Sequence, residues 1–508
     1  MTATDRSIPI DAGVLDPEQI AGLADMDPDA FRAAAHRVVD LMADYIEDIE
    51  RHGVLPPIAP GSVSTQLPPA APEQPEALDA ILGDYLRLIE PNATGWQHPG
   101  FFAYFASTAS GPGILGEMLT AALGQNPMLW RTSPAGTELE QVVVDWLRQA
   151  LGLPAAFDGL LTDTASTSSL IALAAAREAA GIDAAAAGIG GRSDVPALRV
   201  YASEEAHSSI EKACMTLGLG RASLVRIATN DRFELLPDAL AAAIAADRSA
   251  GHRPIAIVAT IGTTSSTSVD PVAAMADIAA SEDLWLHVDA AYAGAVAIDP
   301  GLRAPFAGWE RADSIVVNPH KWLWTPIDAS LLLSRRLAVV RDAFRLVPEY
   351  LRTVVSDGAG GAGIERNFNE YTPQLGRRMR ALKLWILLRW FGLDGLRRRI
   401  RNHLELAQRF TAAVDAEPDW ERLAPVPFST VCFRHVPPGL VGNKSALNAH
   451  NAAIMDAVNR TGEVFLSHTK LRGRFTIRLA IGSLRTERRH VDRAWELLRT
   501  AAEEVGLR

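Results

Sequence analysis

Short apolar runs alternate with helix-forming stretches through the middle of the chain. Residues 255–261 form an almost unbroken apolar run, which is typical of a parallel strand buried on both faces. Residues 170–177 are rich in Ala and Leu and favour a helix. The alternation of such segments from about 140 to 340 predicts an α/β fold with a mostly parallel central sheet. Other expected strands are Leu198–Ser203, Trp285–Asp289 and Ser314–Val317.

The first part of the chain has a helical pattern interrupted by prolines. Apolar residues recur at helical spacing from 29 to 52, which predicts an amphipathic helix, and a second helix is expected from about 75 to 89. The proline-rich stretches 56–60 and 68–72 impose extended chain between them. We therefore expect a helical arm that buries little surface by itself.

The last part of the chain combines helices with strands. A long helix is predicted from residue 383, strands at 429–434 and 475–481, and a closing helix at 491–501. This pattern is typical of a small α+β domain. The expected domains are an N-terminal helical arm (1–110), a large α/β domain (111–382) and a small C-terminal α+β domain (383–508).

Charge and cysteine content exclude several classes of protein. The net charge of −11 argues against a nucleic-acid partner or an anionic membrane, and the short basic runs 397–399 and 485–490 are interpreted as solvated helix faces. Cys214 and Cys432 cannot form a disulfide framework or a zinc site, so no metal is expected. No apolar run typical of a signal peptide or a membrane span is found, and the expectation is a cytoplasmic protein.

Candidate chemistry appears at the ends of two predicted strands. Lys321 follows the strand Ser314–Val317 and precedes bulky apolar residues. A desolvated lysine has a lowered pKa and can attack an aldehyde as the free amine, as in the binding of pyridoxal phosphate (PLP). Asp289 ends the strand Trp285–Asp289, and an acid beside the pyridine nitrogen keeps the PLP ring protonated. Singly, Lys321 and Asp289 could be a solvated cap and a turn cap; together they favour a PLP site.

Three further segments have both a functional and an ordinary interpretation. Residues 158–169 lead from a short strand into the helix at 170–177, and the N–H groups and dipole at such a helix start can hold a phosphate. The alternative is an ordinary Ser/Thr cap. His207 could be a first-turn histidine without further function, and the aromatic cluster 95–105 could belong to the core.

The motif Asp289-Ala-Ala-Tyr-Ala-Gly294, together with Asn318-Pro-His-Lys321-Trp322, resembles the group II PLP-dependent amino-acid decarboxylases, specifically the aromatic-L-amino-acid decarboxylases. The resemblance extends from about Phe31 to the C-terminus. It implies the PLP-dependent transferase fold (fold type I), PLP as cofactor, and conversion of Trp, Tyr, DOPA or Phe to the amine and CO2. It also implies a homodimer with the site at the subunit interface and the arm 1–110 as a dimerisation segment. Other matching stretches are 101–105, 133–140, 206–209, 259–264 and 375–378.

The resemblance also assigns roles to individual residues. Lys321 would bind PLP and Asp289 would pair with the pyridine nitrogen, while His207 would stack on the ring. Tyr350, beside a glycine-rich lid at 356–363, would deliver a proton to the substrate carbon. These four are the expected catalytic residues. The expected cofactor contacts are Ala165, Ser166, His207, Thr264, Asp289, Ala291, Asn318, His320 and Lys321, and the expected substrate contacts are Trp96, Tyr104, Phe105, Ser107, Met128, His207, Leu375 and Gly376.

Other functions stay open at this point. An oxidative aromatic acetaldehyde synthase shares the fold, but there the lid tyrosine is typically phenylalanine or the stacking histidine is replaced, so Tyr350 and His207 favour plain decarboxylation. A decarboxylase of a non-aromatic amino acid such as glutamate needs a cationic, polar pocket, which the aromatic wall disfavours. An inactive PLP-fold binding protein is disfavoured by the intact Lys321 and Asp289.

The identity of the substrate is less constrained than the reaction. Gln125, Asn126 and Met128 replace more apolar or aromatic residues of the animal enzymes, which leaves the choice of substrate open. Gly376 has no side chain and leaves room for a large ring, which favours admitting an indole as well as a phenol.

Overall fold

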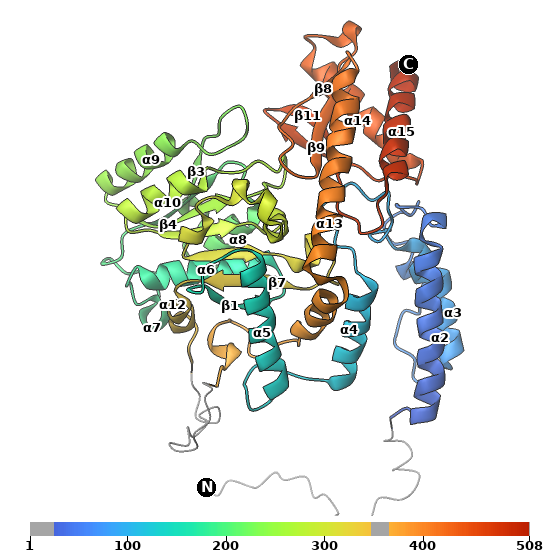
Figure 1. Cartoon of the computed structure of the whole chain (residues 1–508), viewed down its shortest axis with the longest axis horizontal. Coiled ribbons are helices and arrows are strands. Elements are labelled where there is room, and N and C mark those ends of the chain that lie inside the picture. Colours follow the sequence, from blue (N-terminus) through green and yellow to red (C-terminus); the bar gives the residue numbers. More distant parts are fainter. Residues whose placement is uncertain (1–24, 347–364, 507–508) are drawn as a thin grey trace, which may run out of the picture. The chain divides into compact units, whose positions relative to one another are not determined.

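A computed structural model of the chain describes residues 25–346 and 365–506 (Figure 1). The chain divides into two units, one made of residues 1–52 and 57–93 and the other of residues 53–56 and 94–508. None of the helices in the described ranges is long and apolar enough to cross a membrane.

The first unit is helical, as the sequence predicts. No side chain of α2 is buried, so this unit has little core of its own. An ion pair between Arg37 and Asp79 links its two main helices. Its elements are α2 (Pro28–Glu47), 3-10 turns at Ile49–Arg51, Ser64–Gln66 and Glu90–Asn92, α3 (Leu78–Asp84) and a π-helical turn at Tyr85–Ile89.

A seven-stranded sheet organises the second unit, and the prediction of a mostly parallel sheet is confirmed. The strand order is β1-β7-β6-β5-β4-β2-β3, and β7 runs in the direction opposite to the other six strands. The strands are β1 (Asp158–Thr162), β2 (Leu198–Ser203), β3 (Leu224–Ile227), β4 (Arg253–Thr260), β5 (Trp285–Asp289), β6 (Ser314–Val317) and β7 (Ser330–Ser334).

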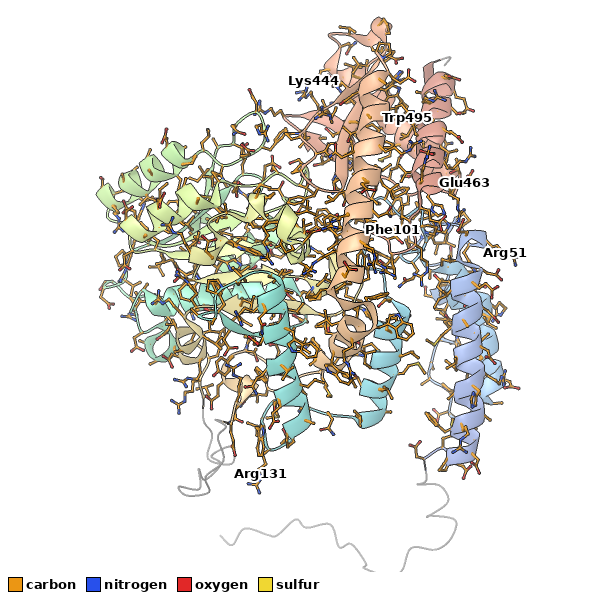
Figure 2. All side chains as sticks on the ribbon, in the orientation of Figure 1. Arg51, Phe101, Arg131, Lys444, Glu463 and Trp495 are labelled. Atoms are coloured by element: carbon orange, nitrogen blue, oxygen red, sulfur yellow. The ribbon has the colours of Figure 1, made fainter. Side chains whose placement is uncertain are left out.

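Helices cover both faces of this sheet, which explains why its central strands are apolar at almost every position. In β4, Ile257 and Ala259 face one hydrophobic cluster, while Ala256 and Val258 face another on the opposite side. Side chains fill the space between sheet and helices (Figure 2). The helices are α4 (Gly111–Leu123), α5 (Pro134–Ala150), α6 (Ala165–Ala179), α7 (Ala184–Ala187), α8 (Ser208–Thr216), α9 (Pro237–Ser249), α10 (Val272–Ser281), α11 (Pro319–Trp322) and α12 (Leu337–Asp342).

The C-terminal part has the expected α+β composition. A four-stranded antiparallel sheet of order β10-β11-β9-β8 carries a separate hydrophobic cluster, in which Trp495 of α15 packs edge-on against Phe410 of α13 (Figure 2). The boundary proposed at 382/383 falls in the first turn of α13 and stays a prediction. The elements are α13 (Ala381–Ala416, kinked at Gly392), β8 (Trp420–Arg422), β9 (Thr430–His435), α14 (Lys444–Arg460), β10 (Ser467–Leu471), β11 (Arg474–Ala480) and α15 (Arg488–Gly506).

Candidate active site

The predicted cofactor residues gather at one edge of the large sheet. Strands β1, β2, β4, β5 and β6 run in the same direction, so their carboxyl ends meet at that edge. Asp289 ends β5 and pairs with Thr260 at the end of β4, and Lys321 lies in the short helix that follows β6. Ligands bind at the carboxyl ends of strands in open α/β sheets. This edge is therefore the candidate active site.

Lys321 has the environment that an amine nucleophile needs. Its side chain is partly buried, and its Nζ atom lies 5.4 Å from the ring centroid of Phe105. Burial lowers the pKa of Lys321, and the negative charge of Asp289 acts in the opposite direction. A lower pKa leaves a larger fraction of the lysine as the free amine. Asp289 itself is buried, and its Oδ1 accepts a hydrogen bond of 3.1 Å from the backbone N–H of Ala291.

His207 is electrostatically coupled to the same two groups. It precedes α8, and its Nδ1 accepts a hydrogen bond of 3.2 Å from the backbone N–H of Ser209, so the neutral ring carries its proton on Nε2. Burial lowers the pKa of His207, Asp289 raises it and Lys321 lowers it. A neutral imidazole that can donate from Nε2 is the form expected at neutral pH.

Unsatisfied polar atoms at this edge fit a polar ligand. Ser203 Oγ, Thr260 Oγ1 and Asn318 Oδ1, at or just after the ends of β2, β4 and β6, are buried and have no hydrogen-bond partner in the described chain. Buried polar atoms normally have one. The first turn of α6, with Ala165 and Ser166, has no side-chain cap, so its backbone N–H groups are available for a phosphate. An amine, an acid and a phosphate-binding helix start together fit PLP.

The remaining predicted cofactor residues differ in how far their side chains are buried. His320 is buried; its Nδ1 accepts from the backbone N–H of Ala329 at 3.0 Å and its Nε2 lies 3.3 Å from Asn318 Nδ2. Thr264, in the loop after β4, has an exposed side chain, while its carbonyl accepts a hydrogen bond of 2.8 Å from Arg478. The Arg478 guanidinium is buried and also donates to three other groups, so it holds this loop in place.

A stack of aromatic rings supports the wall beside Lys321. Phe105 stacks on Tyr292 with centroids 3.7 Å apart, and Tyr292 stacks on Trp322 at 4.7 Å. Trp322 Nε1 donates a hydrogen bond of 2.9 Å to His403 on α13. Sequence reasoning proposed Phe105 but missed Tyr292, although Tyr292 lies inside the motif that begins at Asp289. The stack fixes the plane of Phe105, whose ring lies 5.4 Å from the lysine amine.

The other predicted substrate residues form two further groups. Trp96 and Tyr104 stack at 6.1 Å and are partly exposed, with Ser107 following in the same segment. Met128 lies in a second group with Leu375 and Gly376, and Asn126 bridges the two segments. Asn126 donates to Met128 Sδ at 3.4 Å, and its Oδ1 accepts from the backbone N–H of residue 377 at 2.8 Å.

A buried ion pair holds this second group against the sheet. Arg377 Nη2 lies 2.7 Å from Glu140 Oε1 on α5, and it also donates to the carbonyl of Leu161 in β1 at 2.6 Å. Glu140 Oε1 accepts from the backbone N–H of Leu161, and Arg377 Nη1 donates to the carbonyl of Pro127. Arg377 and Glu140, which are not predicted site residues, therefore position the two segments that carry the predicted substrate contacts Met128, Leu375 and Gly376. Tyr350 and the segment 356–363 lie outside the described residues.

The buried histidines near the site predict a pH dependence of stability. Burial lowers the pKa of His403 to about 4, whereas an unfolded chain has a histidine pKa of about 6.5. Between these values the unfolded state binds a proton that the folded state does not, so the free energy of unfolding decreases as pH falls from about 6.5 to 4. His287 and His320 have the same lowered pKa and act in the same direction, while the raised pKa of Asp270, about 7, acts in the opposite one.

The slope of stability against pH is set by the difference in bound protons between the unfolded and folded states. We expect this difference to be smaller by about one proton in the His403→Gln variant. The free energy of urea unfolding, measured from pH 4.5 to 7 on both proteins, checks this expectation. The glutamine cannot titrate, so the stability difference between the two proteins should narrow at lower pH. Parallel pH profiles would contradict the assignment.

The fold and this set of groups indicate a PLP-dependent enzyme of the α/β class. Comparison with known proteins agrees: a sequence model described as the pyridoxal-dependent decarboxylase conserved domain matches residues 60–436. The chain belongs to this family of PLP-dependent decarboxylases.

Two relatives and one solved structure are similar to this chain over almost its whole length. Tryptophan decarboxylase 2 of Oryza sativa subsp. japonica is 41% identical, with 95% of this chain and 96% of that protein covered. Phenylacetaldehyde synthase of Arabidopsis thaliana is 40% identical, with 94% and 97% covered. The crystal structure of the Oryza sativa enzyme TDC with PLP and tryptamine superposes with a TM-score of 0.89 at 35% identity, over 95% of this chain and 99% of that one. The expectations of a PLP decarboxylase, its cofactor and its fold are confirmed.

Proposed function

We propose that this enzyme decarboxylates an aromatic L-amino acid to the corresponding amine and CO2. The observation that carries the proposal is the position of the Lys321 amine, 5.4 Å from the centroid of Phe105, whose ring is held flat by Tyr292 and Trp322. The amine that binds the cofactor thus lies beside an aromatic wall. Such a wall favours a substrate with a planar, apolar side chain over one with a second carboxylate.

Each residue of the edge has a defined task in this proposal. When bound, PLP supplies an aldehyde that takes up the substrate amine and a ring that accepts the electron pair left by CO2. Asp289 keeps a proton on the pyridine nitrogen, because a buried carboxylate stabilises the positive charge beside it. Lys321 holds the cofactor between turnovers and releases the product amine. His207 would stack on the cofactor ring, and its Nε2–H, left free because Nδ1 accepts from Ser209, would help orient the substrate carboxylate.

The other proposed contacts follow the same arrangement. The helix start at Ala165 and Ser166 would hold the phosphate, and Asn318 and His320, which lie next to each other, would contact the cofactor. Trp96, Tyr104, Ser107, Met128, Leu375 and Gly376 remain proposed substrate contacts, and Ala291 and Thr264 remain proposed cofactor contacts.

An exposed apolar stripe on α4 supports the proposal of a homodimer. Leu115, Met118, Leu119 and Leu123 lie on one face of α4 and are 36–55% exposed in the single chain. Met118, Leu119 and Leu123 lie three, four and eight residues after Leu115, which is the spacing of a helix face that packs against another surface. We infer that a second copy of the chain covers it. Light scattering of the Leu119→Glu variant should report a smaller particle than the wild-type protein.

A second candidate reaction is the oxidative one, because relatives of comparable identity include both decarboxylases and a phenylacetaldehyde synthase. Tyr350 distinguishes the two, since delivery of its proton to the substrate carbon yields the amine. We expect Tyr350→Phe to lower amine formation by about 10²-fold or more and, with O2 as the oxidant, to produce aldehyde, ammonia and hydrogen peroxide. Amine output equal to that of the wild-type enzyme would refute the role given to Tyr350.

The choice of substrate is tested by comparing kcat/KM among amino acids. We expect measurable kcat/KM for at least one of L-tryptophan, L-tyrosine, L-DOPA and L-phenylalanine, and none for L-glutamate. Turnover of L-glutamate at a comparable kcat/KM would overturn the proposed aromatic wall.

A further inference from the structure

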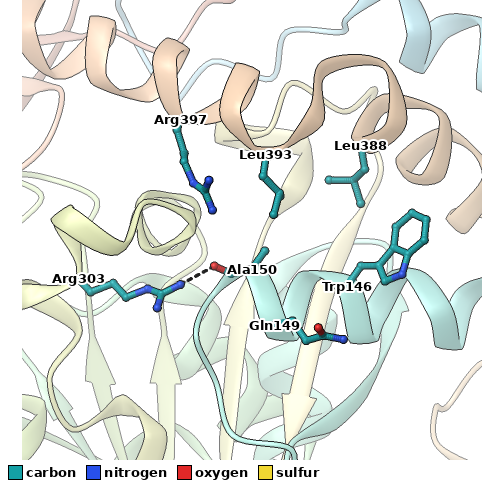
Figure 3. Close-up of a pocket in the computed structure, with 7 residues that line it drawn as sticks. All are labelled: Trp146, Gln149, Ala150, Arg303, Leu388, Leu393 and Arg397. Carbon is teal, nitrogen blue, oxygen red and sulfur yellow. Dashed lines mark hydrogen bonds between the residues drawn. The ribbon is translucent and has the colours of Figure 1, made fainter.

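A pocket between α5 and α13 contains none of the residues of the candidate active site (Figure 3). Its volume is about 390 Å³, which lies within the range of small-molecule sites. The kink of α13 at Gly392, where φ is +61°, falls between two of its leucines. The lining residues are Trp146, Gln149, Ala150, Arg303, Leu388, Leu393 and Arg397.

Two arginines give this pocket a positive charge that no lining carboxylate balances. Arg303 donates through Nε to the carbonyl of Ala297 and through Nη2 to that of Ala150, both at 2.8 Å. Arg397 donates through Nε to the carbonyl of Ile298 at 3.0 Å. These bonds fix both side chains, while Nη1 of Arg303 and both Nη atoms of Arg397 donate to no described residue.

The acids nearest to these arginines along the chain already have other partners. Asp394, three residues before Arg397, pairs with the exposed Arg398. Asp299 is buried, and its Oδ2 lies 2.6 Å from Arg401, which is exposed. Its Oδ1 accepts from the backbone N–H of Gly301 at 3.0 Å. The hydrogen bond from Arg401 is the largest cause of the lowered pKa of Asp299, and the charge of Arg397 also contributes. Arg303 Nη1 and both Nη atoms of Arg397 still have N–H groups to donate to an anion, and arginine binds carboxylates through paired N–H donors.

The pocket separates its charge from its apolar surface. Figure 3 shows the ends of Arg303 and Arg397 at one side and the indole of Trp146 at the other, with Leu388 and Leu393 above the space between them. Trp146 is 40% exposed, so its ring is available for stacking. We propose that this pocket binds an aromatic carboxylate, with the carboxylate on the two arginines and the ring against Trp146 and the leucines.

The positive charge of the pocket disfavours aromatic ligands that carry a positive charge. An aromatic amine would place its ammonium group beside two guanidinium groups, where like charges repel. An uncharged aromatic molecule would leave the arginines unpaired and would bind less well. The pocket should therefore distinguish aromatic molecules by the charge that they carry.

Isothermal titration of the full-length, PLP-loaded enzyme with indole-3-acetate tests the proposal. We expect saturable binding to the wild-type protein and a Kd raised about tenfold or more in Arg397→Gln, because the variant loses a charged donor pair. Arg398→Gln is the matched control, since Arg398 is the next residue, is exposed and pairs with Asp394. Its Kd should equal that of the wild type, and Trp146→Ala should weaken binding through loss of the ring.

Two companion measurements separate this pocket from the active site. In the wild-type protein, tryptamine and indole should not displace indole-3-acetate from the site that depends on Arg397. The Arg397→Gln variant should keep the wild-type kcat for decarboxylation. An equal Kd in Arg397→Gln and wild type would place the probe elsewhere and overturn the proposal. Absence of saturable binding, or displacement by tryptamine at similar concentration, would overturn it as well.

Discussion

Replacing Lys321 by Ala should reduce turnover by roughly 10⁴-fold or more, the scale found when an enzyme loses its nucleophile. The amine at this position is desolvated and lies beside Asp289 and Phe105, so no solvent-exposed lysine can take its place. The visible absorption band of lysine-bound PLP should disappear in the same variant. Initial rates of CO2 release and an absorption spectrum after PLP loading provide the two readouts.

A surface lysine gives the control for this prediction. Lys444→Ala, on the exposed start of α14, should leave both the absorption band and the rate unchanged (Figure 2). If Lys321→Ala retained the band and a rate within tenfold of wild type, another lysine would have to bind the cofactor. The assignment of the carboxyl edge of β6 as the active site would then be wrong.

Replacing Arg377 by Met should lower the free energy of unfolding by about 3–5 kcal/mol, because it leaves the buried carboxylate of Glu140 without its partner. Both side chains are almost fully buried, at 3% and 1% exposed. Arg377 also donates to the carbonyls of Pro127 and Leu161, so the variant loses the anchor of the two segments that carry the proposed substrate contacts Met128, Leu375 and Gly376. We expect KM for the proposed aromatic substrate to rise as well. Urea unfolding and steady-state kinetics measure these two effects.

The neighbouring arginine tests whether burial is the cause. Arg378→Met breaks an ion pair with Glu117 in which the arginine is 51% exposed, and it should cost about 1 kcal/mol or less. The double variant Glu140→Gln, Arg377→Met should lose less free energy of unfolding than the two single variants lose together, because no charge is left buried alone. Equal losses in Arg377→Met and Arg378→Met would contradict this account.

The central fold could be predicted because its strands are buried on both faces. Strands β4, β5 and β6 are apolar at nearly every position, and each predicted range agrees with the observed strand to within two residues. The reversed direction of β7 could not be predicted, because Ser330–Ser334 reads as a buried strand in either direction. Strand β10 was missed because its exposed positions are polar or charged.

The candidate site was predictable where chemistry is concentrated in a motif. Asp289 ends β5 and Lys321 lies in the short helix after the neighbouring strand β6, so their proximity follows from the parallel pairing of β5 and β6. The stack of Phe105 on Tyr292 and the pairing of Arg377 with Glu140 join residues 187 (292 − 105) and 237 (377 − 140) positions apart, and no local pattern encodes such contacts.

The basic run at 397–399 shows the limit of pattern reasoning on a helix. The sequence predicts a solvated face, and Arg398 agrees, with a side chain that is 67% exposed. Arg397, one residue earlier, turns instead toward the chain after β5 and donates to Ile298. A rotation of about 100° per residue along a helix separates the two environments.

The stoichiometry of the reaction tests the central claim most directly. The PLP-loaded protein would be incubated with each aromatic L-amino acid, and CO2, amine, aldehyde and hydrogen peroxide would be measured in the same sample. The account predicts CO2 and amine in a ratio of one to one, without peroxide, for at least one aromatic substrate. Aldehyde and peroxide in place of amine would contradict it and assign the enzyme to the oxidative reaction.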